Sequence, residues 1–379
     1  MNILILFSQP WRVGGAETHV QALIQGLYGD HQLFLAVNTG SDPVRLRELR
    51  EKFPNLTIVT IQARGMNFFA WAGSLVSLAK LLKAGNIQVV SAQQRTAGLW
   101  AWLLKKITGV PFVVTMHDSW HRAIGKSCYG RLFDRMIAVS RNLSERLQAD
   151  FAVDSGRITI VNNGIDFSRF TFFNQTEMRR KLNIDLHCKL ILHVSRLSSI
   201  KGAVSLTLLD SIPRIAERFE SAKLVIIGEG PLRAQLEQKA LAVNQDYDNM
   251  VEIKDFTTDI VSWYSAADMV VGEGRVAIEA LACLKPVVAI RNSECFFGAV
   301  TADNIHAAMT VNFDGKDLPV RPELLVQEIE KAERLSAGDR AEILLAIQQK
   351  MSIPVMAGHY LQVFEESAAI AEHKNSVGQ

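Results

Sequence analysis

The sequence is poor in cysteine, and the few cysteines form no ligand set. Its 379 residues include four of them, with no Cys-x-x-Cys pair and no histidine at the spacing of a zinc site: Cys128, Cys188, Cys283 and Cys295. Reduced, unpaired thiols of this kind are typical of a cytosolic protein. Cys283 stands in an apolar helical pattern, so we expect it in a core.

The chain also lacks an excess of charge and a long hydrophobic run. Its 41 Lys and Arg nearly balance 39 Asp and Glu, which argues against the global field of a nucleic-acid binder. It has no run of about 18 apolar residues, so we expect no helix that spans a membrane. The apolar start MNILILFSQPW has no basic segment and no cleavage site. We therefore expect a strand there, not a signal peptide, and a cytoplasmic protein.

What the first half has instead is an alternation of short apolar runs with amphipathic stretches. Such a pattern predicts a parallel sheet with helices on both faces. Helices are expected at Phe68–Leu82 and Ala97–Ile107, and a first helix after the turn VGGAE. The predicted strands are Asn2–Phe7, Gln32–Val37, Leu56–Ile61, Ile87–Ser91, Phe112–Thr115, Met136–Val139 and Ile158–Val161.

A second alternating series follows a turn at Asn162–Asp166 and a polar stretch, Ser168–His187, which we interpret as a linker. One of its helices is expected to open with Pro231 just inside its start. The chain is thus α/β, with two doubly wound domains, 1–168 and 169–354, and a cleft between them as the expected ligand site. The predicted strands are Leu190–Val194, Lys223–Ile227, Val251–Lys254, Met269–Val271 and Val287–Ile290, and the last helices are Pro322–Leu335, Ala337–Met351 and Val355–Ala371.

Two cations follow the first strand of the second series. Arg196 and Lys201 stand in the polar turn between Leu190–Val194 and the next helical pattern. In a parallel sheet this turn lies at the carboxyl end of the strand, where α/β proteins bind ligands. A guanidinium fork, an ammonium and free helix amides suit a phosphate or diphosphate. The alternative is two solvated surface cations.

A glycine-rich turn, Gly272–Glu279, joins a later strand to a helix. Gly272 and Gly274 would free amides at the helix start, which favours an anion. Glu279 stands one turn inside, in an apolar stretch. An unpaired carboxylate is costly to bury, so we expect Glu279 to pair with a cation or to accept hydrogen bonds from ligand hydroxyls. The alternative is a capping or surface carboxylate.

Other turns offer weaker signals. Gly14 and Gly15 open the first helix without the G-x-G-x-x-G pattern of a dinucleotide site, and either a ligand or a plain turn would explain them. The same holds for the loop 228–231, with Gly228 and Glu229. His117, after the strand PFVVT, could donate to a substrate hydroxyl or act as an acid or base, or be satisfied by neighbouring backbone.

Two further sets of residues are discounted. His19 and His121 are interpreted as surface residues of helical stretches. Asp246 and Asp248 form a D-x-D triplet, which can hold a divalent cation, but it lies in a polar loop without a companion ligand.

Taken in order, the motifs resemble those of the family 4 retaining glycosyltransferases with the GT-B fold of two Rossmann-like domains. The resemblance covers nearly the whole chain. Its motifs are GGAETHV at 14–20, TMHD at 115–118, AVS at 138–140, IVNNGID at 160–166, HVSRLSSIKG at 193–202, LVIIGEGPLR at 224–233, AAD at 266–268 and EALACLKPVVA at 279–289.

The resemblance implies a nucleoside-diphosphate sugar on the C-terminal domain, a UDP-sugar in the favoured reading, and an acceptor on the N-terminal domain. Arg196 and Lys201 match the family's diphosphate cations, so no metal ion or other cofactor is expected. Gly15 matches a glycine that faces the diphosphate or sugar, His117 a sugar contact, and Glu279 the ribose-binding carboxylate. The C-terminal helix 355–371 is expected to return to the first domain.

One departure from the family's pattern concerns its paired glutamates, which are separated by seven residues. Eight positions before Glu279 stands Val271, and Glu273 is the nearest carboxylate. A loop of different length must therefore present the sugar, with Glu273, Gly274 and Arg275 as its candidate contacts.

Three functions are compatible with these residues. The first is a retaining, metal-independent transfer of sugar to a glycan, lipid-linked or small-molecule acceptor. The second is a nucleotide-sugar epimerase or hydrolase on the same architecture. The third is a non-catalytic nucleotide-sugar binding protein.

A separate hypothesis concerns lipid. Asn67–Lys83, with Phe68 and Phe69, and the nearby Trp100 and Trp102 could rest on a membrane or admit a lipid-linked acceptor. The alternative is ordinary packing of these helices on the sheet.

Overall fold

A computed structural model describes residues 1–65, 67–118, 128–292 and 294–377. The chain forms two compact units, one of Met1–Gly164 with Ile353–Gln379 and one of Ile165–Ser352. The first boundary thus falls four residues before the one expected from the sequence, and the C-terminal helix belongs to the first unit. In the described residues no helix is long and apolar enough to cross a bilayer.

The first unit is built on a seven-stranded parallel sheet in the order β3-β2-β1-β4-β5-β6-β7, counted over the described residues. The strand order reverses between β1 and β4, so the carboxyl ends of these two strands flank the crevice in which doubly wound sheets bind ligands. The strands are β1 (Asn2–Pro10), β2 (Gln32–Asn38), β3 (Thr57–Ile61), β4 (Val89–Gln93), β5 (Phe112–Met116), β6 (Met136–Ala138) and β7 (Ile158–Ile160).

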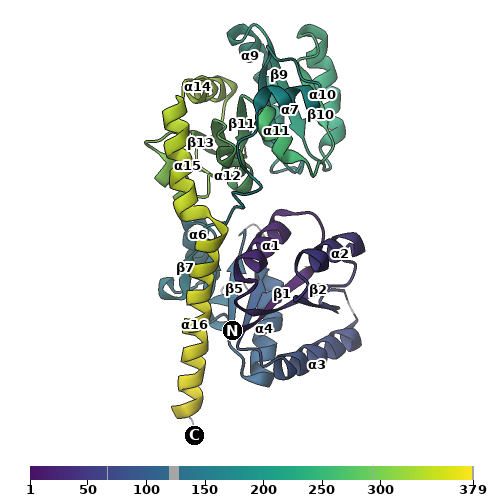
Figure 1. The fold of residues 1–379 in the computed structure, drawn as a ribbon, viewed down its shortest axis with the longest axis vertical. Coiled ribbons are helices and arrows are strands. Elements are labelled where there is room, and N and C mark those ends of the chain that lie inside the picture. The colour runs from purple at the N-terminus through teal and green to yellow at the C-terminus, as the bar shows by residue number, and fades with distance from the viewer. Residues whose placement is uncertain (66, 119–127, 293, 378–379) are drawn as a thin grey trace. The chain divides into compact units, whose positions relative to one another are not determined.

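Helices cover both faces of this sheet because alternate side chains of each buried strand point to opposite faces (Figure 1). In β1, Leu4 and Leu6 pack with one set of helices and Ile3 and Ile5 with the other. The first set is α3 (Phe68–Ala84), α4 (Gln94–Thr108), α5 (Tyr129–Leu132) and α6 (Arg141–Phe151); the second is α1 (Gly15–Leu27), α2 (Pro43–Lys52) and α16 (Ile353–Val377).

The second unit has a sheet of the same order, β10-β9-β8-β11-β12-β13-β14, again over the described residues. β13 and β14, which the apolar pattern did not predict, pair antiparallel with their neighbours. Only two residues separate Asn292 from Cys295, and so short a connection permits only an antiparallel pair. The strands are β8 (Lys189–Val194), β9 (Ala222–Ile227), β10 (Val251–Lys254), β11 (Met269–Gly272), β12 (Val287–Asn292), β13 (Cys295–Ala299) and β14 (Lys316–Asp317).

The helices of this unit pack on both sheet faces, as in the first unit. They are α7 (Gln175–Lys181), α8 (Ala203–Asp210), α9 (Ile212–Arg218), α10 (Arg233–Asp246), α11 (Ile260–Ala266), α12 (Gly274–Ala282), α13 (Ile305–Thr310), α14 (Pro322–Glu333) and α15 (Ala337–Met351). The expected helix start at Pro231 is wrong, because α10 begins two residues later. Cys283 is fully buried, which confirms its place in the core.

The stretch 168–187 is not the linker that its polarity suggested. It contains α7, and Phe170 packs in the hydrophobic core of the second unit. Most polar residues of α7 are exposed, but Arg179 is buried and its guanidinium is engaged: Nη2 lies 2.6 Å from Asp268 Oδ2 and Nε donates to the Ala266 carbonyl. Asp268 also accepts a hydrogen bond from the backbone amide of Leu190, so it links this segment to β8.

Candidate active site

The two cations of the second unit lie between β8 and α8, at the carboxyl end of β8. β8 neighbours β11, where the strand order reverses, so the turn occupies the ligand position of a doubly wound sheet. Arg196 is exposed, and within the described chain its side chain makes no hydrogen bond or ion pair. Lys201 is also exposed, but its Nζ lies 2.5 Å from Glu273 Oε1. The structure therefore presents one uncommitted cation and one held by a carboxylate.

The loop 228–231 packs against this turn. A Cβ on Gly228 would lie 1.9 Å from the Ser195 carbonyl oxygen, and one on Gly230 2.4 Å from that of Leu197. The Leu197 amide donates to the Glu229 carbonyl at 2.9 Å. Both glycines are therefore required because the backbone of this loop lies directly against the turn that carries Arg196 and Lys201. The sequence left a ligand or a plain turn as explanations, but the packing of one loop on the other accounts for both glycines.

A charged cluster surrounds Glu273, which stands at the start of α12 and makes no side-chain cap of that helix. Its Oε2 lies 3.7 Å from Arg291 Nε, and Arg291 also pairs with Asp314. Burial raises the pKa of Asp314 to about 8, and the neighbouring Glu273 carboxylate acts in the same direction. Lys201, Glu273, Arg291 and Asp314 thus form one network at the carboxyl ends of the strands.

Glu279 lies six residues after Glu273, within α12, and is 9% exposed. Its Oε1 lies 3.3 Å from Arg275 Nη2, and its Oε2 accepts a hydrogen bond from the Tyr264 hydroxyl at 3.1 Å. Burial raises the pKa of Glu279, and the nearby Arg275 and Tyr264 oppose that rise. The expectation that this carboxylate pairs with a cation is confirmed, and the partner is the arginine that follows the unusual glycine loop.

In the first unit, His117 follows β5 and is half-buried. Its Nε2 donates to Gln93 Oε1 at 3.1 Å, at the carboxyl end of the neighbouring β4. Its ring also lies edge-on to that of His19, with the centroids 4.5 Å apart. The structure thus places His117 at the ligand edge of the sheet, in contact with polar side chains and not with backbone alone.

His19 is not a surface residue, as its helical setting had suggested, because its side chain is fully buried. Its two ring nitrogens contact Asn163 Oδ1 at 2.9 Å and the Tyr360 hydroxyl at 2.8 Å. Tyr360 belongs to α16, which covers this face of α1. Sequence periodicity could not find that contact, since 341 residues separate the two partners. His121 lies outside the described residues.

Among the described residues, the start of α1 is open at Gly15. Gly14 is its N-cap and provides no side-chain hydrogen bond to the first amides. A Cβ on Gly15 would meet nothing within 4 Å, whereas one on Gly14 would meet only the flexible end of Glu17 within that distance. The first amides of a helix attract anions, so this turn can receive a phosphate or a sugar oxygen.

Several polar residues of these sites carried no prediction: Arg291, Asp314, Tyr264, Gln93 and Asn163. Arg291 gave the same signal as Arg196, a cation at the end of an apolar strand, and could have been found by it. Asn163 stood within the motif IVNNGID, but only the fold shows that it reaches His19.

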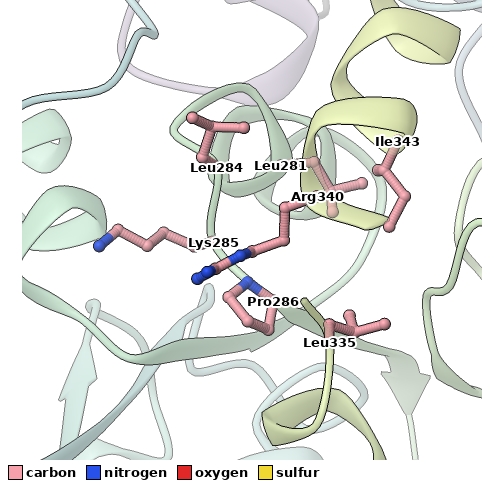
Figure 2. A pocket seen from close by; sticks show the side chains of 7 residues that line it. All are labelled: Leu281, Leu284, Lys285, Pro286, Leu335, Arg340 and Ile343. Carbon is pink, nitrogen blue, oxygen red and sulfur yellow. The ribbon is translucent and has the colours of Figure 1, made fainter. Parts of the chain in front are cut away.

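The D-x-D triplet lies at the opposite end of the second sheet from these sites. Asp246 and Asp248 are exposed and precede β10, so they lie at its amino end. No cluster of three His, Cys, Asp or Glu side chains suited to a metal ion occurs in the described residues. A shallow apolar depression between α12 and α15 lies at the amino end of β12 (Figure 2). It contains Lys285, whose pKa is lowered to about 8 by burial.

Two known families match the chain, one in each half. The family described as Glycosyltransferase Family 4 matches residues 13–169, and the family described as Glycosyl transferases group 1 matches residues 174–338. A D-inositol 3-phosphate glycosyltransferase of Pseudarthrobacter chlorophenolicus is 27% identical over 234 residues, which is 55% of this chain and 55% of that protein. The chain spans about half to two thirds of the length of the curated relatives that it matches first.

Solved structures of similar fold cover nearly the whole chain. A glycosyltransferase from Rickettsia africae superposes with a TM-score of 0.76 at 19% identity, over 96% of this chain and 98% of that one. The Anabaena protein HepE in complex with UDP-glucose gives a TM-score of 0.75 at 18% identity, over 97% and 100%. Likeness at this level of identity shows the fold, which is GT-B, with each unit as one of its two Rossmann-like domains.

Proposed function

This chain belongs to the family 4 glycosyltransferases, and from that premise we propose that it moves a sugar from a nucleoside-diphosphate sugar to an acceptor hydroxyl. The observation that carries the proposal is the turn after β8, where Arg196 is exposed and uncommitted and Lys201 stands five residues on. A guanidinium and an ammonium at the carboxyl edge of the sheet suit a diphosphate that arrives without a metal ion.

We assign the donor to the second unit and favour a uridine nucleotide. HepE, a protein of the same fold, is known in complex with UDP-glucose, which supports this choice. Glu279 would accept hydrogen bonds from the ribose hydroxyls, since it is oriented by Arg275 and Tyr264. The acceptor, whether a glycan, a lipid-linked sugar or a small molecule, would approach the first unit near His117 and the open start of α1.

The reaction breaks the bond between the anomeric carbon and the phosphate oxygen and forms one from that carbon to the acceptor oxygen. The acceptor's proton goes to the leaving phosphate, on the same face of the sugar, which gives retention of configuration. Negative charge grows on the diphosphate as the bond breaks. Arg196 and Lys201 stabilise that charge, and the anomeric centre becomes oxocarbenium-like. Lys201 must therefore share its charge between Glu273 and the diphosphate.

One observation favours a second function. Glu273 neutralises Lys201 and contacts Arg291, so the loop that would present the sugar is already committed to ion pairs. A nucleotide-sugar binding protein without transfer activity would tolerate this, and an epimerase or hydrolase would turn the donor over without an acceptor. Both remain alternatives to the transferase, and they differ from it in the products formed.

The test is to follow UDP-sugars by NMR in EDTA, with and without a panel of acceptors. We predict a glycosylated acceptor, with Arg196→Ala and Lys201→Ala each losing about 100-fold or more in kcat, because such groups act on developing charge. Lys350→Ala, a change of an exposed lysine on α15, is the control. Full activity in both site variants would refute the assigned role of the turn, and donor turnover without acceptor would favour the epimerase or hydrolase.

A further inference from the structure

The outward face of α3 is apolar where a surface helix is usually polar. Phe69 is 93% exposed, Phe68 70% and Val76 55%. The exposed positions between them are small, Ala72 and Gly73, and a Cβ on Gly73 would meet nothing within 4 Å. The face formed by residues 68, 69, 72, 73 and 76 is therefore open, and no part of the described first unit covers it.

The exposed residues of α3 are not needed for packing in the core, because other residues of the helix fill that role. The opposite face of α3 supplies Leu78 and Leu82, both 1% exposed, to the core beneath the sheet. Trp71 and Leu75 pack against that core as well, and Trp100 of α4 is buried in it. The residues that the sequence suggested for a lipid contact therefore fall into two groups. Both tryptophans of α4, the buried Trp100 and the partly buried Trp102, and the inner side of α3 serve the fold, whereas the two phenylalanines do not.

The charged residues in the segment of chain that carries this face all have one sign. No Asp or Glu occurs between Glu51 and Asp118, although the whole chain holds 39 of them. In that interval stand seven cations: Lys52, Arg64, Lys80, Lys83, Arg95, Lys105 and Lys106. Lys80 and Lys83 continue the exposed face of α3 at helical spacing, while Lys105 on α4 pairs with Asp134. α4 lies beside α3 and adds exposed Leu103 and Ile107 (Figure 1).

We propose that α3 docks the protein on an anionic lipid surface. Phe68 and Phe69 would enter the boundary between headgroups and acyl chains, and Lys80 and Lys83 would contact anionic headgroups further along the same face. Apolar side chains beside cations, on a helix that carries no carboxylate, are the combination that binds reversibly to such surfaces. A helix of this kind lies in the interface and does not span it. The inference goes beyond sugar transfer and does not depend on it.

Flotation of the full-length protein with lipid vesicles tests this directly, without donor or acceptor. The probes are phosphatidylcholine vesicles with and without about one third phosphatidylglycerol, at low and high salt. We expect binding to the anionic vesicles that weakens as salt rises. Phe68→Ser/Phe69→Ser should reduce the bound-to-free ratio at least about tenfold, and Lys83→Glu about five- to tenfold on anionic vesicles.

The chain offers matched controls in its second unit. Phe172 and Phe173 are also adjacent and exposed, at 57% and 42%, and Lys350 ends α15 as Lys83 ends α3. Phe172→Ser/Phe173→Ser and Lys350→Glu should bind vesicles like the wild type. Equal losses in test and control variants, or no wild-type binding at low salt, would overturn the proposal. A dimer that Phe68→Ser/Phe69→Ser dissociates, with no vesicle binding, would instead identify a contact between two copies and overturn it too.

Discussion

Burial, more than proximity of charge, decides the protonation of several side chains in the second unit. His193 is 2% exposed, and its Nδ1–H donates to the Val271 carbonyl at 2.8 Å. Burial lowers the pKa of His193 from 6.5 to about 4. Its Nε2 is buried without a hydrogen-bond partner among the described residues, so the ring is neutral at pH 7. It stands three residues before Arg196 and helps to fix β8 against β11.

A pH dependence follows from that shift. The unfolded chain binds the His193 proton below pH 6.5, while the folded chain resists it until about pH 4. The free energy of unfolding should therefore fall by about 3 kcal/mol across this window from His193 alone, and the contribution is fully present above it. We predict that His193→Gln has the flatter profile when urea unfolding is measured from pH 7 to 4. Parallel profiles for the two proteins would contradict this.

For single residues, the sequence predicted which kind of partner a side chain needs better than it predicted which residue supplies that partner. The buried charge of Glu279 required a cation, and Arg275 supplies it one turn away, because that contact is local. Arg291 and Asp314 escaped prediction because Asp314 reaches this site only through the antiparallel strands that precede and follow it. His19 was misplaced because the partner that buries it, Tyr360, comes from the other end of the chain.

Among the elements, the parallel strands of the two sheets could be predicted, since buried strands are continuous apolar runs. The segments that were missed differ in their reasons. β13 is a short apolar run with a glycine inside it, and β14 has only two residues, so neither gave a clear strand pattern. α7 is mostly polar and exposed, and its one buried residue is Arg179, which pairs with Asp268. Pattern alone cannot separate a buried, paired arginine from a solvated one, because the pairing is long-range.

The contact between α1 and α16 gives a matched pair of glycine substitutions. A Cβ on Gly26 would lie 2.6 Å from that of Ala357 in α16, whereas one on Gly358, the next residue of α16, would meet nothing within 4 Å. Gly26→Ala should therefore lower the free energy of unfolding by about 1–2 kcal/mol, because the two helices must separate. Gly358→Ala should raise it by about 0.5–1 kcal/mol through helix propensity. Urea unfolding monitored by circular dichroism measures both.

If Gly26→Ala stabilised the protein as much as Gly358→Ala, the close packing of α16 on α1 would be wrong. That result would also remove the explanation for the burial of His19, since Tyr360 lies on the same face of α16 as Ala357.

Over the whole molecule, the two units carry different chemistry on the same architecture. The second holds the paired cations and the carboxylates at the carboxyl ends of its strands, and the first holds His117, the open start of α1 and the acid-free surface of α3. Both units have the same order of strands, so the difference between them lies in the loops at the strand ends and in the residues that those loops carry. It is the reason that we assign the nucleotide to the second unit alone.

The measurement that tests this assignment most directly is calorimetric titration of the full-length protein with UDP in the presence of EDTA. We predict that the wild type binds UDP without any divalent cation, and that Arg196→Ala and Lys201→Ala each weaken the affinity at least about tenfold, as loss of a charge-assisted contact to phosphate should. Lys350→Ala should bind as the wild type does. Binding that appears only with a divalent cation, or that survives unchanged in both site variants, would contradict the account.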